Sequence, residues 1–185
     1  MELDCLLGRL KRFLGSNPTI ASDVFVAPNA TILGDVSIGS GSSVWFQSVL
    51  RADINKIRIG SETNIQDGSI LHVADRYGLA IGNRVSCGHR AVLHACTIHD
   101  RVLIGINAVV LDGAEVGSDS IIGAGALLTK ETRVPPGSLV LGAPAKVVRP
   151  LTAAEQNSIE ALAAKYVAIG KYYLVERLST GKEEI

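Results

Sequence analysis

This 185-residue sequence has no excess of positive or negative charge, no long apolar run and few aromatic residues. Lys plus Arg and Asp plus Glu both number 18, so no net field draws the protein to nucleic acid or to an anionic membrane. No stretch approaches the roughly 18 apolar residues of a membrane span. Aromatic residues make up 4% of the chain against 47% hydrophobic residues. We therefore expect a core of aliphatic side chains.

Cysteine is also scarce. Cys5, Cys87 and Cys96 form an odd set without Cys-x-x-Cys spacing, which argues against a disulfide framework and favours a reducing compartment. The N-terminus has Glu2 and Asp4 where a signal peptide carries positive charge, and no small-residue cleavage site follows a clean apolar run. These features predict a cytoplasmic protein.

An aliphatic residue recurs at every sixth position along most of the chain. Of the 19 positions in this series, 18 are aliphatic and one is cysteine. The series is Val26, Ile32, Ile38, Val44, Leu50, Ile59, Ile65, Leu71, Ile81, Cys87, Leu93, Ile98, Ile104, Val110, Val116, Ile122, Leu128, Val134 and Val140. A period of six fits neither an α-helix nor an ordinary strand. It predicts a triangular coil of three units per turn, with aliphatic side chains inside and successive turns paired as parallel strands about 4.8 Å apart.

Both ends of the chain carry helical patterns that would cover this coil. We expect residues 1–17 to form an N-terminal capping segment, in which leucines recur at helical spacing; a membrane-surface helix is the alternative. Residues 18–149 would form the β-helix. Residues 150–179 would form a C-terminal helix that packs on it, opened by a capping box between Thr152 and Glu155, and residues 180–185 a flexible tail.

The six-residue period is interrupted three times within residues 50–98. The first two interruptions add three and four residues, and the third removes one. Loops that interrupt a rigid scaffold often carry function, so we expect the functional site here. Three of the four histidines, His72, His89 and His94, lie in this interval. His99 has no such support and is interpreted as structural.

Counting units places His72 and His94 at one corner of the triangle. Each follows an inward leucine, and one full turn separates them, so they lie on adjacent turns about 4.8 Å apart. Arg51 occupies the same corner one turn earlier. His89 lies on a different face and cannot easily reach the pair within one chain. A threefold homo-oligomer would bring His89 of one chain to the histidine pair of the next.

Three neutral imidazoles would leave a fourth coordination position open for water, as in catalytic zinc sites. Asp67 lies one turn from His89 and is a candidate partner for a ligand, as are Asp53 and Gln66. Asp53 could equally form an ion pair between subunits with Arg51. Cys96 lies two residues after His94 and is expected to be a small buried residue. The alternative is that its thiolate binds the metal.

Several strings of the sequence closely resemble γ-class carbonic anhydrase-like proteins of the hexapeptide-repeat superfamily. They are Leu50-Arg-Ala-Asp53, Asn64-Ile-Gln-Asp-Gly68, Leu71-His-Val73, Gly88-His-Arg-Ala-Val-Leu-His94 and Gly142-Ala-Pro-Ala-Lys146. The resemblance covers about residues 18–175. It implies a mainly β fold, a left-handed parallel β-helix with a C-terminal α-helix, and a homotrimer with metal sites between subunits that hold zinc, iron or cobalt.

The resemblance also implies an activity, the reversible hydration of carbon dioxide by metal-bound hydroxide. The ligands would be His72, His89 and His94. The other site residues would be Gln66, which orients the nucleophile or polarises the substrate, Tyr166 from the C-terminal helix, and Arg51, Asp53 and Asp67, which hold the interface and the site.

The sequence differs from the best-studied active enzymes at two places, and both affect the transfer of a proton out of the site. Ile54 occupies the position of a glutamate, and the loop of residues 73–80 is short, with Asp75 as its only carboxylate. A missing proton shuttle predicts slow hydration. The alternatives are acyl-thioester cleavage at the same metal, a CoA-dependent acyltransferase on the same fold, and a non-catalytic assembly subunit.

Overall fold

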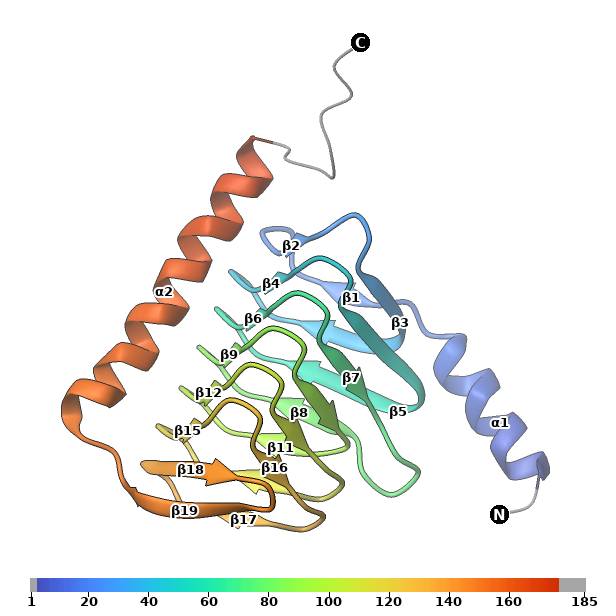
Figure 1. The fold of residues 1–185 in the computed structure, drawn as a ribbon. Helices are drawn as coiled ribbons and strands as arrows, with labels where there is room; N and C mark the ends of the chain where they lie inside the picture. Colours follow the sequence, from blue (N-terminus) through green and yellow to red (C-terminus); the bar gives the residue numbers. More distant parts are fainter. Residues whose placement is uncertain (1–2, 177–185) are drawn as a thin grey trace.

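The computed structural model describes residues 3–176, which form a stack of short parallel strands with one helix at each end of the chain (Figure 1). The helices are α1 (Leu3–Leu14) and α2 (Ala153–Val175). The strands are β1 (Thr19–Ile20), β2 (Phe25–Val26), β3 (Thr31–Ile38), β4 (Ser43–Val44), β5 (Val49–Ile59), β6 (Asn64–Ile65), β7 (Ile70–His72), β8 (Leu79–Ile81), β9 (Ser86–Cys87), β10 (Val92–His94), β11 (Thr97–Ile98), β12 (Leu103–Ile104), β13 (Val109–Val110), β14 (Glu115–Val116), β15 (Ile121–Ile122), β16 (Leu127–Leu128), β17 (Arg133–Val134), β18 (Ser138–Gly142) and β19 (Ala145–Pro150).

The strands form the three faces of a triangular β-helix of about seven turns. The first face contains β2, β4, β6, β9, β12, β15 and β18, with β19 antiparallel to β18 at its end. The second contains the first parts of β3 and β5, then β7, β10, β13 and β16. The third contains β1, the later parts of β3 and β5, then β8, β11, β14 and β17. This confirms the predicted mainly β, parallel β-helix with a C-terminal helix.

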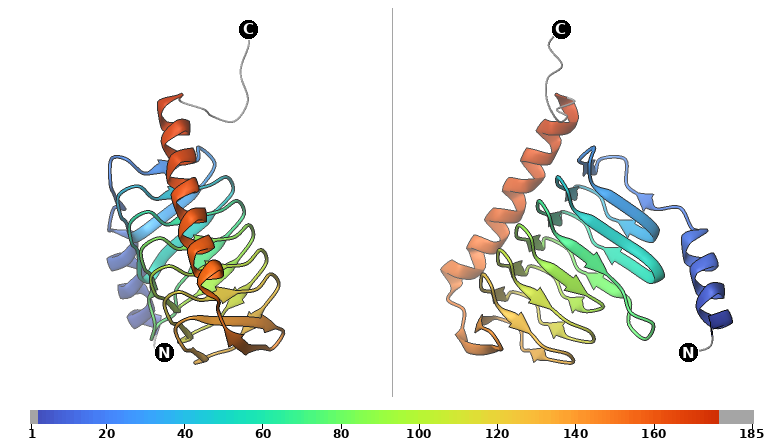
Figure 2. Two further views of the ribbon diagram at one scale, coloured as in Figure 1. Left: turned by 90° about the vertical axis from the view of Figure 1, so that its left-hand side faces the viewer. Right: turned by 45° about the vertical axis from the view of Figure 1, so that its right-hand side comes forward.

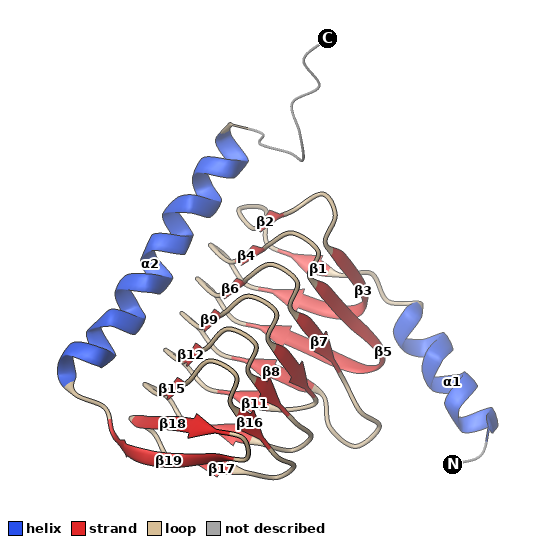
Figure 3. Cartoon of the chain, in the orientation of Figure 1, coloured by secondary structure: helices blue, strands red, loops and turns tan. Residues whose placement is uncertain are grey.

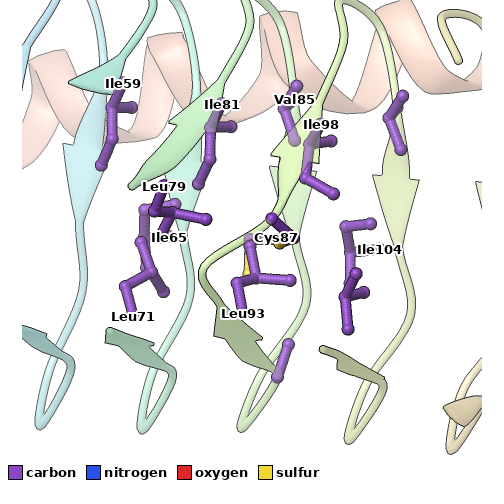
Figure 4. Packing of buried hydrophobic residues seen from close by; sticks show 14 of the residues in the cluster. Ile59, Ile65, Leu71, Leu79, Ile81, Val85, Cys87, Leu93, Ile98 and Ile104 are labelled. Carbon is purple, nitrogen blue, oxygen red and sulfur yellow. The ribbon is translucent and has the colours of Figure 1, made fainter. Parts of the chain in front are cut away.

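The six-residue series forms the core. Of its 19 positions, 17 are buried, and Val26 and Ile32 are partly buried against the same cluster. Figure 4 shows part of this core, in which Ile81 and Ile98 lie in register on neighbouring turns. Burial of an aliphatic side chain stabilises a fold by roughly 1.5–3 kcal/mol, so each turn adds its own share of the core.

The two helices cover different parts of the β-helix. α2 contacts β2, β4, β6 and β9 and runs across the stacked turns of the first face (Figure 2). It opens with the predicted capping box, in which Thr152 Oγ1 accepts from the Glu155 N–H and Glu155 accepts from the Thr152 N–H. α1 covers the corner formed by β3 and β5, where Phe13 is buried. Neither helix within residues 3–176 is long and apolar enough to cross a membrane.

The first interruption of the repeat is not the loop that we expected. β5 continues unbroken from Val49 to Ile59 and bends from the second face to the third (Figure 3). Its extra residues are absorbed where the register against β3 shifts between Gly34 and Val36. The second interruption is a true loop between β7 and β8. The predicted domain boundaries stay predictions, and the predicted tail, residues 180–185, lies outside the described residues.

Candidate metal centre

Two histidines meet at the corner between the second and third faces. His72 ends β7 and His94 ends β10, and the two residues are register partners on adjacent parallel strands. Arg51 is the register partner of His72 one turn earlier. The predicted column of these three residues is therefore present. Nδ1 of His72 lies 3.1 Å from Nε2 of His94.

A carboxylate holds the other nitrogen of each ring. Asp53 Oδ1 lies 3.0 Å from His72 Nε2, and Asp112 Oδ1 lies 2.6 Å from His94 Nδ1. Because an ionised carboxylate only accepts hydrogen bonds, each of these ring nitrogens carries the proton. The two nitrogens that face each other are then both lone-pair donors. A metal ion bound by both nitrogens, or a proton shared between them, stabilises such an arrangement.

The distance between these two donors suits a metal. In a tetrahedral zinc site with Zn–N bonds of about 2.0–2.1 Å, two ligand nitrogens lie about 3.3 Å apart. His72 Nδ1 and His94 Nε2 lie 3.1 Å apart, close to that value. Their carboxylate partners are also the usual companions of metal-bound imidazoles, because they fix the tautomer and orient the ring. The residues present therefore fit a divalent transition metal.

The pKa shifts in this corner favour a neutral His72 and ionised Asp53 and Asp112. Burial lowers the pKa of His72, which favours the neutral imidazole that a metal requires. Burial opposes ionisation of Asp53, but hydrogen bonds from His72 and Arg51 outweigh it and hold the Asp53 pKa below its usual value. Asp112 is likewise desolvated, and its hydrogen bond with His94 holds its pKa below the usual value. The Arg51–Asp53 ion pair lies within one chain.

His89 lies at the opposite edge of the second face, in the corner after β9. Its Nδ1 lies 2.8 Å from Asp67 Oδ2, as the one-turn spacing predicts, and both side chains are 43% exposed. Tyr166 of α2 is half-buried beside Trp45, with ring centroids 5.7 Å apart. Burial, reinforced by the negative charge of Asp67, raises the Tyr166 pKa. Tyr166 therefore packs in the aromatic cluster under α2, within electrostatic range of Asp67.

Gln66 is buried next to this corner, on the first face. Its Nε2 donates to Asn64 Oδ1 at 3.0 Å, and Asn64 in turn donates to Ser86 Oγ. Within residues 3–176 of one chain, no three His, Cys, Asp or Glu side chains are arranged to hold a metal ion. One chain thus brings together His72 and His94 with their carboxylates, and separately His89 with Asp67.

Sequence reasoning missed Asp112. Asp112 lies 18 residues after His94, which is the length of one regular turn, and this spacing could have pointed to it. The turn that begins at Leu93 is one residue short, because Leu93 pairs with Val110 only 17 residues later. Counting units along the chain therefore does not place Asp112 opposite His94. Cys96 is buried, and burial raises the pKa of its thiol, which disfavours a thiolate ligand. His99 lies outside both corners and pairs with Glu115.

The sequence interpretation also missed an aliphatic stripe on the outside of the second face. Its members are register partners on successive strands and none of them is fully buried: Val49, Ile70, Val92, Val109 and Leu127. The equivalent outward column of the third face contains charged and small residues: Arg58, Ala80, Thr97, Glu115 and Arg133. The stripe separates the corner of His89 from the corner of His72 and His94.

Comparison with known proteins agrees with the repeat. The family described as bacterial transferase hexapeptide (six repeats) matches residues 17–52 and 95–130. The chain is 40% identical over 173 residues to γ carbonic anhydrase 2, mitochondrial, of Arabidopsis thaliana, covering 90% of this chain and 62% of that protein. It is 42% identical over 161 residues to a carbonic anhydrase of Geobacillus kaustophilus, covering 87% and 88% of the two chains. The chain belongs to the γ-carbonic anhydrase-like family.

Solved structures extend this relation to the fold. The γ-carbonic anhydrase-like chain matches a hexapeptide transferase family protein from Anaplasma phagocytophilum with a TM-score of 0.82 and 39% identity, covering 86% of this chain and 94% of that one. The chain spans about 60% of the length of the two Arabidopsis relatives that it matches.

Proposed function

We propose that this protein is a homotrimeric lyase that catalyses the reversible hydration of carbon dioxide at metal sites shared between neighbouring subunits. The observation that carries the proposal is the pair of ring nitrogens of His72 and His94 that face each other 3.1 Å apart, with a carboxylate on the other nitrogen of each ring. Zinc is the proposed metal, with iron or cobalt as alternatives, because imidazole ligands suit all three. We also propose that the protein acts in the cytoplasm.

The second face supports a shared site, because it has one half of the site at each edge. Three chains arranged around a threefold axis with their second faces inward would place His89 of each chain against His72 and His94 of the next. The aliphatic stripe would then be buried around the axis, and removal of this apolar surface from water would stabilise the trimer. Asp67 and Tyr166 would enter the neighbour's site together with His89.

In this proposal the bound metal supplies a hydroxide and a Lewis acid. His72 and His94 bind it as neutral donors, and Asp53 and Asp112 hold their tautomers. Arg51 keeps Asp53 ionised and in place. Asp53, Asp112 and Arg51 therefore position other groups rather than reacting themselves.

Gln66 is proposed to orient the nucleophile. One N–H of its amide donates to Asn64, which orients the group. Its carbonyl oxygen can then accept a hydrogen bond from the nucleophile, and its second N–H can donate to a substrate oxygen. Asp75, the only carboxylate of the loop after β7, lies 3.4 Å from Arg9 on the side of α1. It is therefore tied away from the histidines, which supports slow proton exit and slow hydration.

An acyltransferase is the second candidate, because both the matching family and the Anaplasma protein carry the word transferase in their names. Stopped-flow hydration assays, run beside acyl-CoA hydrolysis and acyl-transfer assays, separate the candidates. The lyase proposal expects carbon dioxide hydration that is lost when His94 is replaced by alanine. Acyl-CoA turnover without hydration would overturn it.

Metal content tests the site itself. Protein purified without oxygen should contain close to one zinc, iron or cobalt ion per chain. A trimer that is purified without metal, and takes up none when it is offered, would rule the site out.

A mixing experiment tests whether the site is shared. One chain carries His89→Ala and the other carries both His72→Ala and His94→Ala. Neither homotrimer should bind metal, whereas some interfaces of the mixed trimers contain all three histidines and should regain it. If the mixture binds no more metal than its parts, each site lies within one chain.

A further inference from the structure

A hollow on the third face adjoins the corner of His72 and His94 but is lined by no histidine. Its volume is about 400 Å³, within the range of small-molecule sites. The strand register explains why it is there. Along the outward column, Ala80 and Thr97 lie on two successive turns between the long side chains of Arg58 and Glu115. Two short side chains between two long ones leave a depression about two strand spacings wide.

Positive charge is concentrated around this hollow. Its charged lining residues are four cations and one carboxylate, in a chain with a formal net charge of zero: Lys56, Arg58, Arg76, Arg133 and Glu115. Arg58 and Arg133 are each paired with a carboxylate. Lys56 and Arg76 make no ion pair with any residue of 3–176, the part of the chain that the structure describes. The hollow therefore offers two cations, Lys56 and Arg76, whereas the Arg58 guanidinium is already held by Asp35 and the Ile57 carbonyl.

The loop between β7 and β8 holds Arg76 at the rim. The Ala74 N–H donates to the Tyr77 carbonyl at 2.9 Å, which closes the loop into a tight turn. Tyr77 packs on Gly113, where a Cβ atom would come within 3.2 Å of the ring and where φ is +68°. The Arg76 guanidinium lies 5.1 Å from the centroid of the Tyr77 ring, within cation–π distance. The rim is thus largely formed before any ligand binds.

We propose that this hollow binds a small phosphate ester. A guanidinium group recognises phosphate oxygens in bidentate fashion and an ammonium adds a compact charge, so Arg76 and Lys56 together suit a dianion. The organic part of the ligand would lie over Ala80 and Thr97. This site is distinct from the metal centre, since its lining includes none of His72, His89 and His94 and none of their carboxylate partners.

The test uses adenosine 5′-monophosphate as the phosphate ester and adenosine as its uncharged counterpart, with binding measured by calorimetry on the full-length protein. The variant is Lys56→Gln/Arg76→Gln. A control variant, Lys146→Gln/Lys171→Gln, removes the same charge at two exposed positions outside the hollow. Circular dichroism and thermal melting establish that both variants fold.

We expect the nucleotide to bind saturably and adenosine not to bind. Loss of two charge-assisted contacts should weaken nucleotide binding by at least about tenfold in the rim variant, whereas the control variant should bind like the parent protein. Equal weakening in both variants would indicate a response to net charge alone and overturn the proposal. So would unchanged binding in the rim variant, or the absence of saturable binding in the millimolar range.

Discussion

Replacement of Asp112 by asparagine tests the central argument about the histidine pair. Asp112 accepts a hydrogen bond from His94 Nδ1–H at 2.6 Å, which favours the tautomer with Nε2 unprotonated toward His72. An amide loses the charge of this contact, and its NH2 group can donate to Nδ1 and move the proton to Nε2. A protonated Nε2 cannot bind metal. The substitution therefore weakens metal binding without removing a ligand.

The size of the effect follows from the contact. Loss of a carboxylate partner of a metal-bound imidazole typically lowers metal affinity by about 10- to 100-fold, or about 1.4–2.7 kcal/mol. Competition with a fluorescent zinc chelator measures this affinity. Asp119→Asn is the matched control, because Asp119 pairs with Arg101 at another corner and should leave the affinity unchanged. If Asp112→Asn binds zinc as tightly as the parent protein, the tautomer argument is wrong.

Three further predictions concern assembly, thiols and acid stability. Ile70→Glu should convert the trimer to monomers in sedimentation velocity, because burying a charge at the stripe costs several kcal/mol, whereas Ile70→Val should stay trimeric; a trimeric glutamate variant would contradict the proposed axis. Burial raises the pKa of Cys87 to about 12, so a thiol reagent should modify the exposed Cys5 in the native protein and Cys87 only on unfolding. Hydrogen bonds from Arg149 and then from the N-cap of α2 lower the pKa of Glu155 to about 2, so its contribution to stability is present above pH 4.5 and lost as the pH falls toward 2. Urea unfolding across this range should show the loss, and Glu155→Gln should lack it.

Much of the fold could be predicted because one physical rule repeats along the chain. Each turn buries its aliphatic side chains against those of the turns on either side, so the period alone sets which residues become register partners. Counting units was therefore enough to bring His72 to His94 and Asp67 to His89. These pairs depend on backbone register, which the core determines.

The features that the sequence did not predict depend on departures from that register. β5 absorbs its additional residues in a bend covered by α1, so a longer spacing produced a continuous strand instead of a loop. The contact of Asp112 with His94 depends on a turn that is one residue short. The aliphatic stripe escaped because its residues lie beside the inward positions, where an apolar residue is not needed for the core of one chain.

The location of half a site at each edge of the second face has a consequence for metal exchange. In the proposed trimer, the free energy of metal binding and the free energy of subunit association are linked, so each equilibrium shifts the other. Dilution of the protein should lower its apparent affinity for the metal, and a chelator should shift the trimer toward monomers. The supply of metal to the cell would then regulate how much of the protein is assembled.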